Sequence, residues 1–200
     1  MSAPLRLGIL GSGKGSNFRA IMEEIVDGRL NAEVRIVISD VENSGILSFA
    51  HDFQVPGLYV RPGRFRTRLE PEIEEDIVRL LLGADVELVV LAGFMRIVKQ
   101  PLLRAFPRKI INIHPSLLPK FPGLEAWKQA LAAGESKTGC TVHYVDAAID
   151  AGEILGSETV PILTDDTPES LHARIQRVEH VLLPSVIAGL AAGERRGVGA

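Results

Sequence analysis

Cysteine and long apolar runs are both scarce in this sequence. Its 200 residues include a single cysteine, Cys140, which cannot form a disulfide within the chain and suits a reducing compartment. The richest apolar stretch covers residues 88–95, whereas a membrane-spanning helix needs roughly 18 apolar residues or more. The amino-terminal residues lack the apolar core of a signal peptide. We therefore expect a cytoplasmic protein with no membrane partner.

Excess charge of one sign is also missing. The chain has 22 Lys and Arg against 25 Asp and Glu, a formal net charge of −3 at pH 7. Such a balance provides no overall positive field that would attract a nucleic-acid backbone, so we expect no nucleic-acid partner. Any anion site should depend on a local group of residues. The hydrophobic content of 46% is typical of a globular protein. We expect one domain over residues 1–193 and a frayed tail over 194–200, which has no apolar periodicity.

Short apolar runs alternate with helical periodicity through the first half of the chain. Strands are predicted at residues 5–10, 34–38, 57–60, 88–91 and 109–113, and helices at 18–26, 44–53, 71–82 and 125–133. Two later β-rich runs, 138–145 and 153–162, could pair antiparallel, and a long helix begins at Thr167, which Pro184 should bend or interrupt. The pattern predicts an α/β fold: a single-domain, open, mainly parallel twisted sheet with antiparallel strands in the C-terminal half and a long C-terminal helix.

A glycine-rich segment, residues 11–17 (GSGKGSN), lies between the first predicted strand and helix. Glycines in such a turn let backbone N–H groups approach an anion, and the helix dipole favours negative charge. The dinucleotide fingerprint fails because Ser16 replaces its last glycine, and the nucleotide P-loop fails because Gly15 stands where a metal-binding hydroxyl belongs. We favour a site for a phosphomonoester, the alternative being a tight turn without a ligand.

Asn112 and His114 stand two residues apart at the end of a predicted strand, so their side chains share one face. This pair suits acyl transfer to an amine, because a carboxamide N–H can stabilise an oxyanion and an imidazole can relay a proton. A carboxylate beside the histidine would orient it and favour its protonated form. Asp150 is the candidate and Asp146 the other choice. Taken alone, a histidine in this position is more often a structural hydrogen bonder.

Four motifs occur in order along nearly the whole chain: residues 12–17 (SGKGSN), 91–97 (LAGFMRI), 111–123 (INIHPSLLPKFPG) and 142–152 (VHYVDAAIDAG). Together they resemble the phosphoribosylglycinamide formyltransferase family. The resemblance implies a Rossmann-like formyltransferase domain that moves a formyl group from 10-formyltetrahydrofolate to the amine of glycinamide ribonucleotide in purine biosynthesis. It also implies that no metal takes part.

The resemblance assigns roles to individual residues. It implies that the acceptor and its phosphate are held by Gly15, Ser16, Asn17 and Glu179. It implies that the folate donor is bound by Arg68, Met95, Arg96, Ile97, Val98 and Asn112, with the backbone of 95–98 around the pterin. The catalytic residues would be Asn112, His114 as proton donor and Asp150, which would raise the pKa of that histidine. Arg64 or Arg66 could take the place of Arg68.

Other functions fit parts of this pattern. A hydrolase could use the same three catalytic residues with water as acceptor. Formyl transfer to initiator tRNA is disfavoured by the net charge, and a non-catalytic nucleotide-binding module would use the near-miss P-loop alone. The partners we expect are small molecules, with the chain as a monomer or homodimer.

Overall fold

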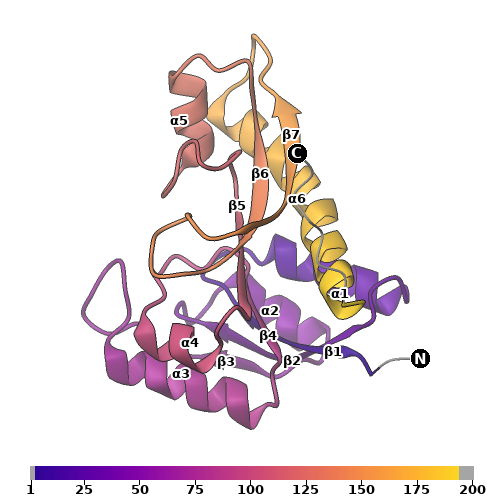
Figure 1. Cartoon of the computed structure of the whole chain (residues 1–200), viewed down its shortest axis with the longest axis vertical. Helices are drawn as coiled ribbons and strands as arrows, with labels where there is room; N and C mark the ends of the chain where they lie inside the picture. Colours follow the sequence, from indigo (N-terminus) through magenta and orange to yellow (C-terminus); the bar gives the residue numbers. More distant parts are fainter. Residues whose placement is uncertain (1–2, 194–200) are drawn as a thin grey trace.

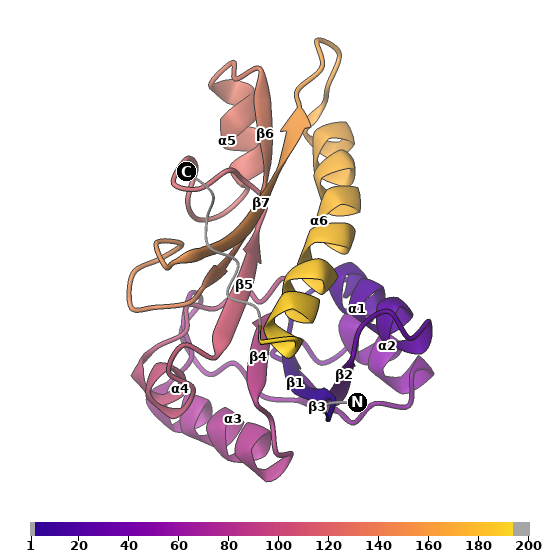
Figure 2. The ribbon, with the colours of Figure 1, turned by 45° about the vertical axis from the view of Figure 1, so that its right-hand side comes forward.

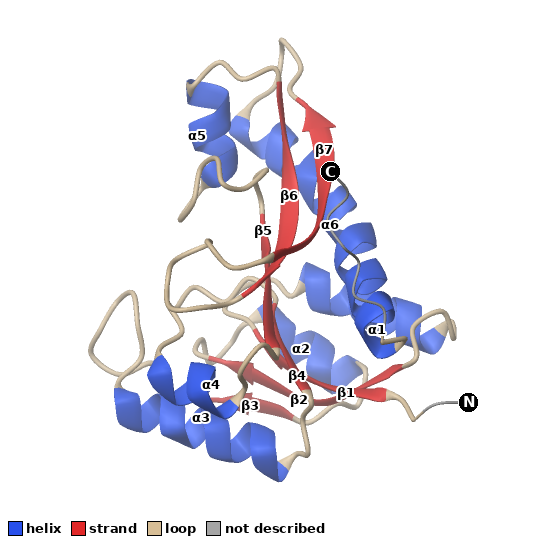
Figure 3. Cartoon of the chain, viewed as in Figure 1, coloured by secondary structure: helices blue, strands red, loops and turns tan. Residues whose placement is uncertain are grey.

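The computed structural model describes residues 3–193. They contain one seven-stranded sheet with helices packed on it (Figures 1 and 3). Its strand order is β3-β2-β1-β4-β5-β6-β7. The strands are β1 Leu5–Leu10, β2 Ala32–Ser39, β3 Gly57–Tyr59, β4 Leu88–Leu91, β5 Ile110–His114, β6 Lys137–Tyr144 and β7 Ile154–Pro161. Strands β1 to β5 run parallel, whereas β6 pairs antiparallel with both β5 and β7. The predicted mainly parallel sheet with antiparallel strands in the C-terminal half is confirmed.

The helices cover both faces of this sheet (Figure 2). They are α1 Ser16–Val26, α2 Gly45–Asp52, α3 Pro71–Gly83, α4 Gln100–Ala105, α5 Ala126–Ala132 and α6 Pro168–Ala191. Buried side chains of α1, α2 and α6 share one apolar cluster with Leu7 and Ile9 of β1. Those of α3 and α4 share the other cluster with Leu10. Neighbouring residues of β1 thus face opposite layers, as expected of a strand buried on both faces.

The C-terminal helix differs from its prediction in one respect. Its start agrees, because Thr167 caps it by accepting a hydrogen bond from the Ser170 amide, and Pro168 occupies the first turn. Pro184 does not interrupt it, however, and α6 continues to Ala191. Proline removes one backbone hydrogen bond, but Pro184 lies on the buried side of a helix that packs against α1, β6 and β7. We infer that this packing outweighs the lost bond.

One helix and the C-terminal tail differ from the other elements in how they compare with the sequence predictions. Helix α4 was not predicted, since its six residues are too few for an apolar period to show. The frayed tail predicted at 194–200 lies outside the described residues. Within residues 3–193, no helix is both long enough and apolar enough to cross a membrane.

Candidate active site

Strand β5 ends in the two polar side chains singled out from the sequence. Asn112 and His114 lie two residues apart on it, with Asn112 half-buried and His114 only 4% exposed. On one side β5 pairs in parallel with β4, and on the other its antiparallel register places His143 of β6 opposite Asn112. The switch from parallel to antiparallel pairing therefore brings a second imidazole to this strand end.

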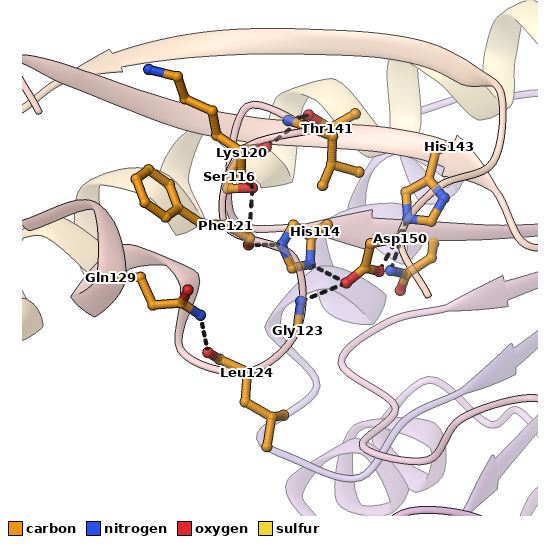
Figure 4. Close-up of polar contacts among 12 residues, drawn as sticks. His114, Ser116, Lys120, Phe121, Gly123, Leu124, Gln129, Thr141, His143 and Asp150 are labelled. Atoms are coloured by element: carbon orange, nitrogen blue, oxygen red, sulfur yellow. Dashed lines mark hydrogen bonds and ion pairs between the residues drawn. The ribbon is translucent and has the colours of Figure 1, made fainter. Parts of the chain in front are cut away.

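The carboxylate beside these residues is that of Asp150 (Figure 4). Its Oδ2 lies 3.4 Å from Nδ1 of His114 and accepts a hydrogen bond of 2.8 Å from the Gly123 amide. Its Oδ1 lies 3.5 Å from Nε2 of His143. The alternative, Asp146, is exposed and accepts a hydrogen bond from the Ala148 amide instead. Of the two acids considered, the structure brings Asp150 to His114.

Asp150 is held in its ionised form. Burial alone would raise its pKa, but the hydrogen bonds from His143 and the Gly123 amide, with the nearby charge of His114, lower the pKa below its ordinary value. Asp150 also has a left-handed backbone with φ of 50°. The following Gly152 runs so close to the Tyr144 carbonyl that no Cβ could be accommodated there. This tight turn aims the carboxylate into the site.

Both ring nitrogens of His114 face acceptors. Nε2 lies 2.9 Å from the Phe121 carbonyl oxygen, while Nδ1 faces the Asp150 carboxylate. An imidazolium can donate at both positions, whereas a neutral ring can donate at one. The loop that supplies the carbonyl is ordered by Ser116, whose hydroxyl donates to the Lys120 carbonyl at 2.6 Å (Figure 4). The His114 ring is thus held between a carbonyl oxygen and a carboxylate.

Sequence analysis gave no role to His143, which lies within the predicted β-rich run 138–145. Its Nδ1 lies 2.8 Å from the Tyr144 carbonyl oxygen and its Nε2 lies 3.2 Å from Nδ2 of Asn112, besides facing Asp150. The ring therefore joins the Asn112 amide to the Asp150 carboxylate. When Nε2 accepts from Nδ2, one N–H of Asn112 is used and the other has no partner among residues 3–193.

The glycine loop begins α1 with a conformation that glycine alone tolerates well. Gly15 has a φ of 80°, and a Cβ there would lie 2.6 Å from the Ile46 Cα. Beside it lies a cavity of about 580 Å³, lined in part by Lys14, Ser16 and Arg19. The cavity suits an anion at the helix N-terminus. None of Asn112, His114 and Asp150 lines it.

Asn17 and Glu179, predicted to serve the same substrate, do lie together. Nδ2 of Asn17 donates a 2.9 Å hydrogen bond to Oε2 of Glu179 across the interface between α1 and α6. Burial raises the pKa of Glu179, and the bond from Asn17 offsets part of that rise. Oδ1 of Asn17 is buried with no partner among the described residues. The pair thus keeps an unused acceptor.

The predicted donor segment follows Gly93, beyond the end of β4. Met95 is exposed and Val98 is buried, while the side chain of Arg96 turns inward to the Asp40 carboxylate at 2.6 Å. Among the nearby arginines, Arg64 pairs with Glu70 at 2.9 Å and Arg68 places its guanidinium 4.2 Å from the Phe65 ring centre. The guanidinium of Arg68 is exposed and has no acid partner among residues 3–193. The Arg96 side chain is thus directed toward Asp40, and its backbone is the part proposed to serve a ligand.

No cluster of three or more histidine, cysteine or acidic side chains that could hold a metal ion occurs within residues 3–193.

Comparison with known proteins agrees with this arrangement. A family model described as formyl transferase matches residues 5–187. The phosphoribosylglycinamide formyltransferase of Bacillus subtilis (strain 168) is 38% identical over 192 residues, which are 96% of this chain and 97% of that protein. The trifunctional purine biosynthetic protein adenosine-3 of Drosophila pseudoobscura pseudoobscura is 43% identical over 195 residues. A crystal structure of glycinamide ribonucleotide transformylase 1 from Symbiobacterium toebii superposes with a TM-score of 0.92 at 42% identity, covering 96% of this chain and 90% of that one.

Fold, site and sequence thus define the class of protein: the chain belongs to the formyl transferase family. Within that family its full-length likeness is to phosphoribosylglycinamide formyltransferases, so the resemblance seen in its four motifs is confirmed. The chain spans 14% of the length of the trifunctional insect relatives, so it matches one segment of those proteins.

Proposed function

We propose that this chain transfers the formyl group of 10-formyltetrahydrofolate to the amine of glycinamide ribonucleotide, a step of de novo purine biosynthesis. One observation carries the proposal: Asn112, His114 and Asp150 meet at the carboxyl end of β5, joined through His143. The glycine loop after β1 and the turn after β4 lie at neighbouring strand ends, linked by a 3.0 Å hydrogen bond from the Ser12 amide to the Gly93 carbonyl. Ligands of parallel sheets gather at this edge.

The catalytic groups match the charges that such a transfer develops. The acceptor amine attacks the formyl carbon, forming a C–N bond and placing negative charge on the formyl oxygen. An unpartnered N–H of Asn112 can stabilise that oxyanion. As the bond from the formyl carbon to the folate nitrogen breaks, His114 protonates the leaving nitrogen, and the proton that the acceptor amine gives up passes to the His114 ring and restores it. Asp150, whose pKa is lowered, carries a negative charge and lies 3.4 Å from Nδ1 of His114, where it can orient the ring for this step.

Each substrate has a place around these groups. Backbone amides at the start of α1, from Gly15 to Asn17, would bind the acceptor phosphate, with Lys14 near by. The unused Asn17 oxygen and the Glu179 carboxylate would accept hydrogen bonds from the rest of that substrate. The backbone of residues 95–98 would bind the pterin of the donor, and Arg68, free of acid partners in the described chain, would face its anionic end. The proposed partners are thus small molecules, and we expect the protein in the cytoplasm as a monomer or homodimer.

Acceptor dependence tests the proposal. The chain is mixed with 10-formyltetrahydrofolate, with and without glycinamide ribonucleotide, and loss of the formyl group from the folate is followed by absorbance. Deformylation that requires the acceptor, with one formylated product formed for each folate released, supports the transferase. Equal deformylation in its absence identifies a hydrolase, and no reaction in either mixture contradicts the proposal.

A further inference from the structure

A buried carboxylate outside the catalytic group joins the two substrate segments. Asp40 follows β2, and its side chain is 4% exposed. Its Oδ1 accepts a 2.5 Å hydrogen bond from the Ser12 hydroxyl in the glycine loop. Its Oδ2 accepts a 2.6 Å hydrogen bond from Nε of Arg96 in the turn after β4. One carboxylate therefore contacts the loop proposed for the acceptor and the turn proposed for the donor.

The contacts of Ser12 continue this connection through the backbone. Its hydroxyl accepts a 2.9 Å hydrogen bond from the Met95 amide while donating to Asp40. Its own amide donates to the Gly93 carbonyl. The Ser12 hydroxyl therefore connects the Asp40 carboxylate to the Met95 backbone.

Arg96 extends the connection to a third segment. Its Nη1 donates to the Phe65 carbonyl at 2.8 Å and also to the Arg66 carbonyl. The next residue, Ile97, donates its amide to the Thr67 carbonyl at 2.8 Å. The Arg96 side chain is 15% exposed, and its Nε and Nη1 donate to groups of the protein itself. The backbone of 95–98 is thus fixed from both sides by polar contacts that converge on Asp40.

We propose that Asp40 is a positioning residue that sets the donor-binding backbone at 95–98 against the acceptor-binding glycine loop. This inference rests on the proposed function, because it takes those two segments as the substrate sites. Asp40 contacts no reacting atom. It acts through Ser12 and Arg96, so its loss alters donor affinity more than the chemical step.

A second ion pair of the chain shows what a structural role alone would do. Asp166 is paired with Arg174 at 2.7 Å and its side chain is 2% exposed, close to the values for Asp40. It lies at the start of α6, where it also accepts a hydrogen bond from the Leu163 amide. Asp166→Asn therefore removes a comparable pair at a place with no proposed substrate contact.

The test compares donor binding by Asp40→Asn, Asp40→Ala and Asp166→Asn. Asp40→Asn keeps an acceptor for Ser12 and loses the ion pair, whereas Asp40→Ala loses both. Dissociation constants for 10-formyltetrahydrofolate are measured by titration, and KM and kcat by acceptor-dependent deformylation. We expect the dissociation constant for 10-formyltetrahydrofolate to rise about ten-fold for Asp40→Asn and further for Asp40→Ala, with a smaller change in kcat. Asp166→Asn should bind the donor like wild type even where its melting temperature falls.

The outcomes separate this inference from the proposed function. Wild-type affinity in both Asp40 variants, or an equal loss in Asp166→Asn, overturns the positioning role and leaves the formyl transfer standing. A wild-type chain that binds no donor overturns both. If Asp40→Ala does not fold, Ser12→Ala replaces it, since that change removes the acceptor of the Met95 amide and keeps the ion pair. Ser12→Ala should also raise the dissociation constant for 10-formyltetrahydrofolate.

Discussion

At the scale of single residues, the site consists of polar groups that complete one another's hydrogen bonds. Asp150 accepts from the Gly123 amide and faces the rings of His114 and His143. His143 in turn contacts Asn112. Buried polar groups are costly unless partnered, so a connected group of this kind fixes the direction of each member. Removing one member should therefore misdirect the others and impair the reaction.

The first prediction concerns the proposed catalytic residues His114 and Asn112. His114→Ala should lower kcat by 10² or more, since it removes the proposed proton donor. Asn112→Ala should lower kcat by a similar factor through loss of an oxyanion donor, about 3 to 4 kcal/mol of transition-state stabilisation. Steady-state rates and thermal melts are measured together. His51→Ala, at an exposed histidine of α2, is the control and should react like wild type; near-normal kcat in either site variant would refute the assigned role.

The second prediction concerns pH. Because its pKa is lowered, Asp150 carries a negative charge at neutral pH, 3.4 Å from Nδ1 of His114. As pH falls through that lowered pKa, Asp150 becomes neutral, and activity that depends on its charge should decline, a decline that an asparagine cannot show. The pH–rate profile of Asp150→Asn should shift accordingly, while that of Asp146→Asn should match wild type. A shift seen only in Asp146→Asn would reverse the assignment.

The third prediction concerns stability. Burial raises the pKa of Glu179 in the folded chain, so the unfolded chain releases this proton first as pH increases. The contribution of Glu179 to stability should thus decline as pH rises above the unfolded value of about 4.3, because ionisation of this group favours unfolding. Glu179→Gln escapes that cost: its melting temperature should equal wild type at low pH and exceed it at pH 7. Its KM for glycinamide ribonucleotide should increase. Glu158→Gln, at an exposed strand position, should show neither effect.

The sequence predicted some of these residues better than others. Asn112 and His114 were found because they share one strand, where side chains alternate with a fixed period. Asp150 remained one of two choices until the turn geometry separated it from Asp146. His143 and Asp40 were not assigned roles, because each depends on contacts between distant segments. The pairing of β5 with β6 selects His143, and nothing local in the sequence reveals that register.

At the scale of secondary structure, two helices form the proposed binding site for the acceptor. α1 begins at the glycine loop, and α6 packs against it to bring Glu179 to Asn17. Apolar periodicity predicted both helices, because each has a continuous buried face. Helix α4 and the passage of α6 through Pro184 were not predicted. The first is too short for a period, and the second depends on tertiary packing.

The fourth prediction tests the start of α6. Thr167 and Ser170 form a capping box, with each side chain bonded to the other residue's amide. Thr167→Ala should lower the free energy of unfolding by about 1 kcal/mol. It should leave kcat and both KM values unchanged, since the cap lies far along the helix from Glu179. Denaturant titration and steady-state kinetics provide the comparison, with Thr167→Ser as the control that retains the cap. An altered KM would contradict the separation of cap and site.

At the scale of the whole molecule, the sheet brings every proposed segment to one edge. The parallel strands β1, β4 and β5 stand side by side and end in the glycine loop, the donor turn and the Asn112–His114 pair. Antiparallel β6 and its turn to β7 then return His143 and Asp150 to that edge. Alternation of strands and helices predicted the parallel part. The joining of the two parts at β5 is a long-range pairing that needed the structure.

The most direct test is a crystal structure of this chain with glycinamide ribonucleotide and a non-transferable analogue of the formyl donor. The formyl oxygen should lie about 3 Å from the side-chain nitrogen of Asn112. The acceptor amine should lie beside the formyl carbon, with His114 facing the folate nitrogen and Asp150 still beside His114. A formyl group bound away from Asn112 and His114, or a complex in which Asp150 has left the histidine, would contradict it.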